Sequence, residues 1–269
     1  MKTAAARRIG LSAGAGITLA FIMMALVALV WTPYDPAGID IPGKLMPPGA
    51  RHWFGTDQLG RDVLSMIMAS ARGSVGVAFF STGLGLVFGV PLGLIAAARS
   101  DWVDEFIMRG NDLLFAFPSL LLAILLTAVF GPGAVNACIA IGVFNIPVFA
   151  RVTRGAALGI WTQDFSMAAR VAGKGPLRIS VEHVLPNLLT LLTVQATIQF
   201  SLGVVAEAGL SYLGIGVQPP TPSWGRMLSD AQTLTALAPS LALFPGLAVA
   251  LFVLGLTLLS SGLRPGREG

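Results

Sequence analysis

The chain has 269 residues, of which 55% are hydrophobic and only 11% are charged. Soluble globular domains carry about 25% charged residues, so this composition argues against a soluble enzyme and indicates an integral membrane protein. The formal net charge is +4. In a membrane protein the placement of positive charges matters more than their number, and no nucleic-acid partner is expected. The single cysteine, Cys138, excludes an internal disulfide.

Six apolar stretches are long enough, or nearly so, to cross about 30 Å of hydrocarbon, which takes about 20 helical residues. They are residues 9–31, 73–98, 112–130, 134–150, 187–207 and 239–262. The first is longer than the apolar core of a signal peptide and no cleavage site follows it, so we interpret it as a span. The Gly131-Pro132-Gly133 turn predicts a helical hairpin between the third and fourth. The predicted fold is an all-α integral membrane protein with six transmembrane helices.

Six spans place both termini on one side of the membrane. If that side is the cytoplasm, 12 of the 17 Lys and Arg residues lie in cytoplasmic segments. The positive-inside rule therefore predicts a multi-pass protein of the cytoplasmic membrane with both termini in the cytoplasm. The predicted organisation is an N-terminal tail, first span and external segment (1–72), a core of five spans (73–262) containing a cytoplasmic loop (151–186), and a cytoplasmic tail (263–269).

The cytoplasmic loop contains a basic, half-apolar segment, "DFSMAARVAGKGPLRISVEHVLPN", at 164–187. Its apolar residues Trp161, Phe165, Ala168 and Ala172 recur at helical spacing, and Ser166 and Arg170 fall on the opposite face. This pattern predicts a short amphipathic helix. It fits a helix that binds another protein, and also one that rests on lipid.

Glycines and prolines divide this loop. Gly173 and Gly175 can end the first helix, and Pro176 suits the first position of a second. Pro186 is expected to end the second helix just before the fifth span. The loop is thus predicted to form a pair of short helices.

The sequence lacks the motifs of an enzyme. Lys174 lies in Gly-Lys-Gly, but the spacing and hydroxyl residue of a phosphate-binding loop are missing, and His183 has no second histidine at zinc-binding spacing. We therefore expect no catalytic role, no metal and no cofactor in this chain.

Two alternative functions stay open. One is an ion-coupled secondary transporter, with Glu207 and Asp112 as ionisable groups at span ends. The other is a non-transporting membrane scaffold.

Two segments lie on the predicted external side. Thr56 and Asp57 are placed to cap a short helix at the membrane surface. In the second segment, Pro219 and Pro220 stiffen the chain before Trp224. Rigid loops with an aromatic tip suit docking of another protein, although loops that pack on the surface and close the fold explain the pattern equally well.

Three quoted segments resemble one family. "MAARVAG" followed by "HVLPN" resembles the EAA loop of binding-protein-dependent ABC importer permeases, with Met167 where a glutamate is usual. "HWFGTDQLGRDVLSM" (52–66) and "AEAGLSYLGIGVQPPTPSWGRML" (206–228) are similar to the peptide/nickel branch of these permeases. The resemblance extends over nearly the whole chain from Thr32 to Arg264 and implies the fold of a type I importer permease.

The resemblance also implies function and partners. The chain would form half of the translocation pathway for dipeptides, oligopeptides or related small solutes, and would work by alternating access. Its partners would be a second homologous permease, two cytoplasmic ATPase subunits or domains that bind ATP and Mg, an extracytoplasmic substrate-binding protein, and membrane lipid. The loop helices would act as coupling helices.

Two sets of site residues follow. The residues expected to contact the ATPase are Phe165, Met167, Ala168, Ala169, Arg170, Gly173, Lys174, Leu177, Leu185 and Pro186. Those expected to dock the binding protein or form an external gate are Thr56, Asp57, Arg61, Asp62, Glu207, Pro219, Pro220 and Trp224.

Overall fold

The computed structural model describes residues 2–99 and 102–263. Within these ranges the chain is helical and contains no strand, only an isolated β-bridge between Thr56 and Asp62. Most of the predicted tail at 263–269, including Arg264 and Arg267, lies outside the described residues. The α-helices are α1 (Lys2–Val27), α2 (Val63–Leu84), α3 (Val90–Ala98), α4 (Trp102–Ala116), α5 (Ser119–Phe130), α6 (Ala134–Trp161), α7 (Asp164–Val171), α8 (Pro176–Ile179), α9 (Leu185–Tyr212), α10 (Trp224–Ala231) and α11 (Ser240–Leu263).

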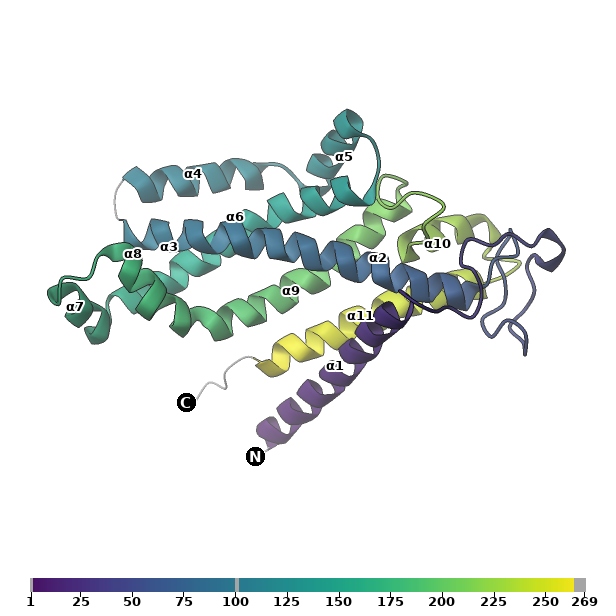
Figure 1. Ribbon diagram of the computed structural model, residues 1–269, viewed down its shortest axis with the longest axis horizontal. Coiled ribbons are helices and arrows are strands. Elements are labelled where there is room, and N and C mark those ends of the chain that lie inside the picture. Colours follow the sequence, from purple (N-terminus) through teal and green to yellow (C-terminus); the bar gives the residue numbers. More distant parts are fainter. Residues whose placement is uncertain (1, 100–101, 264–269) are drawn as a thin grey trace.

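The long helices run back and forth along one axis of the molecule (Figure 1). Five helical stretches have the length and composition to cross a membrane, namely Arg8–Val27, Val63–Ala98, Ala134–Trp161, Pro176–Tyr212 and Ser240–Leu263. The bent pair α4 and α5 supplies a sixth crossing if it counts as one span. The start of α1 lies beside the end of α11 (Figure 1), where Gly262 approaches Leu11.

The third predicted span, 112–130, is wrong as a continuous helix. Helix α4 ends at Ala116, and α5 leaves it at an angle of 83°. Pro118 at the break explains the stop, because the residue before a proline is pushed out of the helical conformation. Helix α5 has 12 residues and measures about 18 Å, which is too short to cross the hydrocarbon alone.

Helix α4 is held beside α6 by ion pairs between side chains. Arg154 Nε donates to Asp104 Oδ1 at 2.5 Å, and Arg151 pairs with Asp112. Arg151 also lies over the ring of Phe115, 4.4 Å from its centroid. Helix α5 packs on α6 through apolar residues instead, since Ala123 shares a buried cluster with Ala137 and Ala140.

At two other prolines the helix continues, and a π turn precedes each of them. The π turn Gly85–Gly89 precedes Pro91, and the π turn Ser180–Val184 precedes Pro186. A proline lacks the N–H group and its ring crowds the carbonyl four residues back, so a wider turn relieves the conflict. The expectation that Pro186 ends the second loop helix is therefore wrong. From Pro176 to Tyr212 the chain forms one helical stretch of 37 residues.

Glycines of the π turn Gly85–Gly89 and of α3 allow close packing on α6. A methyl group on Gly85 would lie 2.6 Å from Cβ of Asn145, and one on Gly89 would lie 2.5 Å from the carbonyl oxygen of Ile146. Gly93 makes a similar approach. Gly83 does not, because nothing lies within 4 Å of the position that its Cβ would occupy.

Candidate functional site

The α7 end of the molecule, residues 161–184, protrudes beyond the spans (Figure 1). Helix α7 buries only its small side chains, Ser166 and Ala169. The Ser166 hydroxyl donates to the carbonyl oxygen of Ile160 at 2.8 Å, and Ala169 joins an apolar cluster that includes Phe149 and Leu188 of the spans. The small residues Ser166 and Ala169 thus pack inward, whereas Phe165 and Ala168 of the predicted apolar face are exposed.

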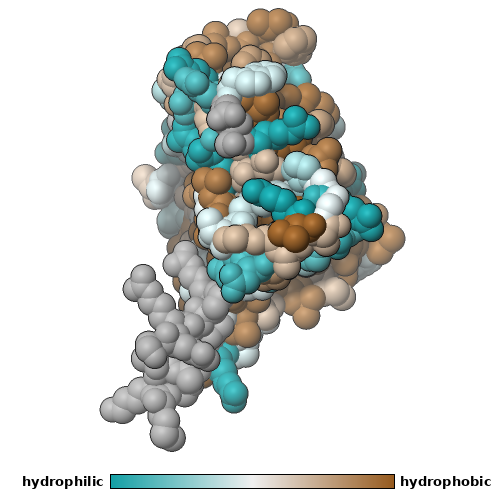
Figure 2. All heavy atoms as spheres, turned by 90° about the vertical axis from the view of Figure 1, so that its left-hand side faces the viewer, coloured by the Kyte–Doolittle hydropathy of each residue, from teal (hydrophilic) through white to brown (hydrophobic). Residues whose placement is uncertain are grey.

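Five apolar side chains are exposed at this end, and we call them the apolar tip: Phe165, Met167, Val171, Leu177 and Val181. Val171 is the most open of them, with 89% of its side chain exposed. Figure 2 shows this end face-on, with hydrophilic side chains around a small hydrophobic patch. Exposed apolar residues rimmed by polar ones are typical of a protein interaction site.

The turn after α7 has a defined hydrogen-bond pattern. Gly173 has a φ of +82°, which favours glycine, and its N–H donates to the carbonyl oxygen of Arg170 at 3.0 Å. The next N–H, of Lys174, donates to the carbonyl oxygen of Ala169 at 3.1 Å. These two bonds form a Schellman motif, so the helix end predicted at Gly173 is confirmed.

Beyond the turn, ion pairs join the loop to the start of the fifth span. Lys174 Nζ donates to Glu182 Oε2 at 2.7 Å and lies 3.0 Å from Nε2 of His183. Arg178 Nε donates to Glu182 Oε1 at 2.6 Å. Arg170 remains on the surface, 5.5 Å from the ring of Trp161. Thus Lys174 fixes the loop to its own span.

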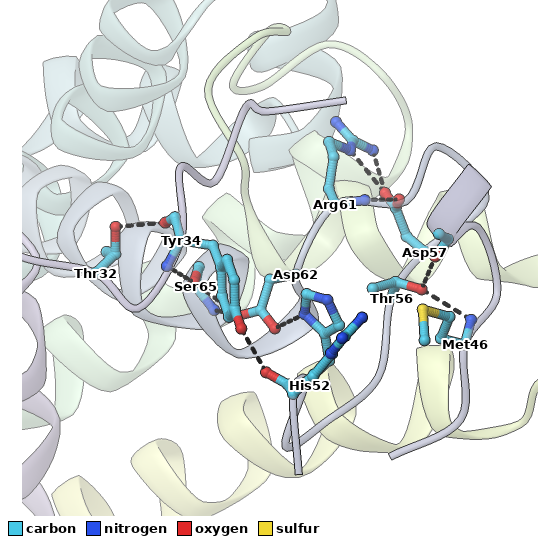
Figure 3. A network of polar contacts seen from close by, with 11 residues as sticks. Thr32, Tyr34, Met46, His52, Thr56, Asp57, Arg61, Asp62 and Ser65 are labelled. Carbon is cyan, nitrogen blue, oxygen red and sulfur yellow. Dashed lines mark hydrogen bonds and ion pairs between the residues drawn. The ribbon is translucent and has the colours of Figure 1, made fainter. Parts of the chain in front are cut away.

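At the opposite end of the long axis lies the loop end, residues 32–62 and 207–231. Its polar groups converge on one another (Figure 3). Asp62 is the N-cap of α2: its Oδ2 accepts from the N–H of Ser65 at 2.8 Å, and its Oδ1 lies 2.9 Å from Nδ1 of His52. Tyr34 stacks obliquely on His52 with ring centroids 4.6 Å apart, and its hydroxyl donates to the carbonyl oxygen of Arg51 at 2.7 Å.

The predicted helix cap at Thr56 and Asp57 is wrong. No helix starts there, and both side chains shape the loop itself. Thr56 Oγ1 donates to the carbonyl oxygen of Gly43 at 2.5 Å and accepts from the N–H of Met46 at 2.8 Å. Asp57 accepts from the N–H and from Nε of Arg61, at 2.9 and 2.7 Å. The helix cap is Asp62, five residues later.

Two further side chains of the loop end are fully buried, Glu207 and Trp224. Glu207 accepts hydrogen bonds from Ser74 at 2.5 Å, Ser211 at 2.7 Å and Ser223 at 3.0 Å. These serines come from α2, α9 and the segment before α10, so one carboxylate joins three parts of the chain.

Trp224 forms part of the core. Its Nε1 donates to the carbonyl oxygen of Ile67 at 3.1 Å, and its ring lies 5.9 Å from that of Phe21 and 6.1 Å from that of Phe252. Trp224 thereby joins α1, α2, α10 and α11.

The described residues contain no group of three or more His, Cys, Asp or Glu side chains that could hold a metal ion. Residues 89–265 match the family model described as binding-protein-dependent transport system inner membrane component. The chain belongs to this family. It is therefore a permease component, a non-catalytic membrane subunit, and the fold class predicted from the sequence is confirmed.

Curated relatives of this permease cover most of its length. It is 42% identical over 248 residues to the dipeptide transport system permease protein DppC of Alkalihalophilus pseudofirmus, covering 92% of this chain and 82% of the relative. It is 41% identical over 259 residues to the glutathione transport system permease protein GsiD of Salmonella paratyphi A, covering 96% and 85%. These relatives confirm the peptide/nickel branch.

A solved structure shares the fold of this permease. A chain of the MetNI methionine ABC transporter, solved in inward-facing conformations, superposes with a TM-score of 0.59 at 17% identity. The match covers 74% of this permease and 97% of that chain. At this identity the likeness shows the architecture alone.

The structure divides the predicted site residues of the permease into exposed and buried ones. At the α7 end, Phe165, Met167, Ala168, Arg170 and Leu177 are exposed, whereas Ala169 is buried. Leu185 packs against the core, and Pro186 lies in the first turn of α9. The protruding part of the predicted site is thus shorter than expected and ends before the fifth span.

At the loop end of the permease, most predicted docking residues are buried. Thr56, Asp57, Asp62, Glu207 and Trp224 are buried in this structure, and their role in docking or in an external gate stays a prediction. Arg61 is mostly buried in its pair with Asp57. Only Pro219 and Pro220 of this set are exposed.

Sequence reasoning missed Val171 and Val181 at the apolar tip. Val171 follows Met167 by four residues, and Val181 follows Leu177 by four. This spacing places each pair on one helical face. A search for a second apolar stripe in the loop would have found both valines.

Proposed function

We propose that this permease is one of two homologous membrane subunits of an ATP-driven importer, and that its apolar tip seats in a groove of a partner ATPase. The observation that carries this proposal is the exposure of Met167, Val171 and Leu177 on a loop whose other face is buried against the spans. Moving one such side chain from water into a partner's pocket stabilises a contact by about 1.5–3 kcal/mol. Arg170 at the rim would steer the approach more than it adds affinity.

The proposed mechanism is alternating access. ATP and Mg bind to the two partner ATPases, and closure of these subunits moves the docked α7 ends of the two permeases. The Schellman turn and the Lys174–Glu182 ion pair join α7 to the fifth span, so the loop and the span move as one body. The ATPase acts on the equilibrium between inward-facing and outward-facing states because it binds one state better than the other.

The proposed orientation puts the α7 end and both termini in the cytoplasm. With this orientation, 12 of the 17 Lys and Arg residues lie in cytoplasmic segments. The positive-inside rule favours such an excess on the cytoplasmic side. The loop end then faces outward, where an extracytoplasmic binding protein would deliver cargo. In this proposal the buried polar groups keep the loop end rigid, and exposed residues such as Pro219 and Pro220 make the contact.

The proposed cargo is a dipeptide, an oligopeptide or a related small solute. Support comes from the relatives, which are dipeptide and glutathione transport system permease proteins. Both of these cargoes contain peptide bonds. The binding protein would make most of the selection.

A cysteine experiment tests the docking and the orientation together. In a Cys138→Ser background, Val171→Cys and Val30→Cys place single thiols at side chains that are 89% and 88% exposed, at opposite ends of the molecule. In cells, a thiol reagent that cannot cross the membrane should label only Val30→Cys. In the purified assembly, a bifunctional crosslinker at Val171→Cys should reach the ATPase.

Val30→Cys is the matched control because its exposure is equal and it should never reach the ATPase. Crosslinks from Val171→Cys that reach only lipid would contradict the docking. Uptake of cargo by the permease alone, without ATPase or ATP, would instead indicate a secondary transporter.

A further inference from the structure

Two amide side chains meet in the middle of the spans. Asn145 on α6 and Gln199 on α9 are only 3% and 5% exposed. Gln199 Nε2 donates to Asn145 Oδ1 at 2.7 Å, and Asn145 Nδ2 donates to the carbonyl oxygen of Ser81 on α2 at 3.2 Å. Polar side chains inside a membrane are costly and are often retained for function.

These amides line a cavity of about 410 Å³ between α5, α6 and α9. Its other walls are apolar and include Phe144 and Leu202, and no charged side chain lines it. The volume falls within the range of about 300–1,000 Å³ that is usual for small-molecule sites. An apolar cavity with a few convergent polar groups has the composition of a ligand site.

The amides have hydrogen-bonding capacity to spare. A carboxamide offers two N–H donors and an oxygen with two lone pairs. In the hydrogen bonds of the described residues, Asn145 and Gln199 each donate one N–H. The oxygen of Gln199 accepts only a long bond, 3.4 Å, from Nε2 of Gln195. One further donor on each residue and an acceptor on Gln199 are therefore free for a molecule in the cavity.

We propose that this cavity is a transit site for cargo containing peptide bonds, in which Asn145 and Gln199 hydrogen-bond the cargo's backbone amide. This inference rests on the proposed function and deepens it. A peptide group presents one N–H donor and one carbonyl acceptor, which matches what the two carboxamides offer. Because backbone groups are common to all peptides, the site accepts different side chains.

Other occupants fit the cavity less well. A lipid acyl chain makes no hydrogen bonds and would leave the free N–H groups unpaired in an apolar setting. A helix of the second permease has its backbone groups bonded within the helix, so only its side chains could pair with these N–H groups. An ion of a single sign would find no countercharge in the wall, whereas a dipeptide is a zwitterion with no net charge. Neutral hydrogen bonds hold cargo weakly, which suits a site that must release it.

Photocrosslinking tests the occupant directly. The assembled transporter, with binding protein and ATPases, is reconstituted in proteoliposomes and given ATP and radiolabelled alanyl-alanine. A photoreactive benzoylphenylalanine replaces Leu202, which is exposed and lines the cavity, or Leu251, a similarly exposed leucine on α11 that does not. We expect the dipeptide to label the protein through position 202 and not through position 251.

A substitution tests the amide itself. Gln199→Met keeps the length of the side chain and removes its hydrogen bonds, and we expect at least a tenfold fall in kcat/KM for dipeptide uptake with ATP hydrolysis retained. Thr193→Val on the same helix is the control, because the Thr193 hydroxyl bonds only to the carbonyl oxygen of Leu189 within the helix and lies outside the cavity. Its uptake should equal that of the wild type.

Several outcomes would overturn the inference. If position 202 captures only lipid or the second permease, the cavity has another occupant. Wild-type uptake in the Gln199→Met transporter would show that the amide is not used. Crosslinking at position 202 uses the native amides, so it decides the question even if the Gln199 variant fails to assemble. A wild-type assembly that hydrolyses ATP but imports no dipeptide would contradict the proposed cargo as well, whereas normal import without labelling at position 202 contradicts this inference alone.

Discussion

At the α7 end of this permease Val171 and Leu177 are exposed and the ion pairs lie on the surface, whereas at the loop end Glu207 and Trp224 are buried. The α7 end buries Ile179 and Val184 in the core but leaves the apolar tip uncovered. The loop end uses even its polar side chains internally, in hydrogen bonds to other parts of the chain. The two ends therefore differ in whether their side chains contact the rest of the chain, and this difference fits the proposed binding role of the α7 end.

Removal of Trp224 should cost the most stability and so tests the loop end most strongly. Trp224→Ala leaves a large cavity among α1, α2, α10 and α11, and losses of about 3–5 kcal/mol are usual for a buried tryptophan. We expect a large fall in the thermal denaturation midpoint of the purified assembly. Trp53→Ala is the matched control, because Trp53 lies at the same end and is exposed. Equal midpoints for both variants would contradict the assignment of Trp224 to the core.

We expect the second-largest loss of stability when Glu207 is replaced. Glu207→Ala leaves the hydroxyls of Ser74, Ser211 and Ser223 without their acceptor, at a cost on the order of 1–3 kcal/mol for an unsatisfied buried group. Glu207→Gln keeps an acceptor oxygen and should lose less. Thermal denaturation measures both, and Glu105→Ala, at an exposed carboxylate of α4, serves as control. If the Gln and Ala variants are equally unstable, the hydroxyl contacts are not what matters.

The same logic predicts the reverse result at the α7 end. Val171→Asp changes an exposed side chain, so its effect on stability should stay within about 0.5 kcal/mol. Uptake should nevertheless fall at least tenfold, because a carboxylate cannot enter an apolar pocket unpaired. Val171→Ile preserves the apolar surface and should transport normally. Normal uptake by Val171→Asp would remove the tip from the proposed interface.

The smallest effect is expected for the exposed ion pairs of the loop. Glu182→Gln should leave the thermal midpoint unchanged within error, since exposed pairs contribute little. Limited proteolysis should still detect faster cleavage after Lys174, because the side chain no longer pairs with the fifth span. Arg109→Gln, at an exposed pair on α4, controls for a general effect of charge. Unchanged cleavage would show that the Schellman turn alone holds the loop.

Much of the fold could be predicted because hydropathy and proline–glycine punctuation act locally. The span positions follow from apolar runs, and the turn at Gly173 follows from a backbone conformation that favours glycine. The break at Pro118 could not be predicted, since Pro147 and Pro245 lie inside unbroken helices. Whether a proline breaks a span depends on the neighbours that satisfy its freed carbonyl groups.

The site was predicted less well, because burial depends on partners distant in the sequence. Nothing local to Glu207 shows that Ser74 lies beside it, 133 positions away. Pro219 and Pro220 before Trp224 suggested a stiff exposed tip, whereas Phe21 and Phe252 pack against the Trp224 ring. The resemblance pointed to the segment that protrudes from the spans but could not say which side of α7 faces inward.

Because the helix from Pro176 to Tyr212 is unbroken, its length determines how its two ends are oriented relative to each other. Its 37 residues extend over about 55 Å, and each residue is rotated by about 100° about the helix axis relative to the one before it. One residue added or removed near Thr190 would swing the Glu207 carboxylate a quarter-turn or more away from Ser74 while Leu177 stayed in place. The number of residues between the two ends therefore fixes how one end is rotated relative to the other. Substitutions along this helix should be tolerated more readily than insertions or deletions.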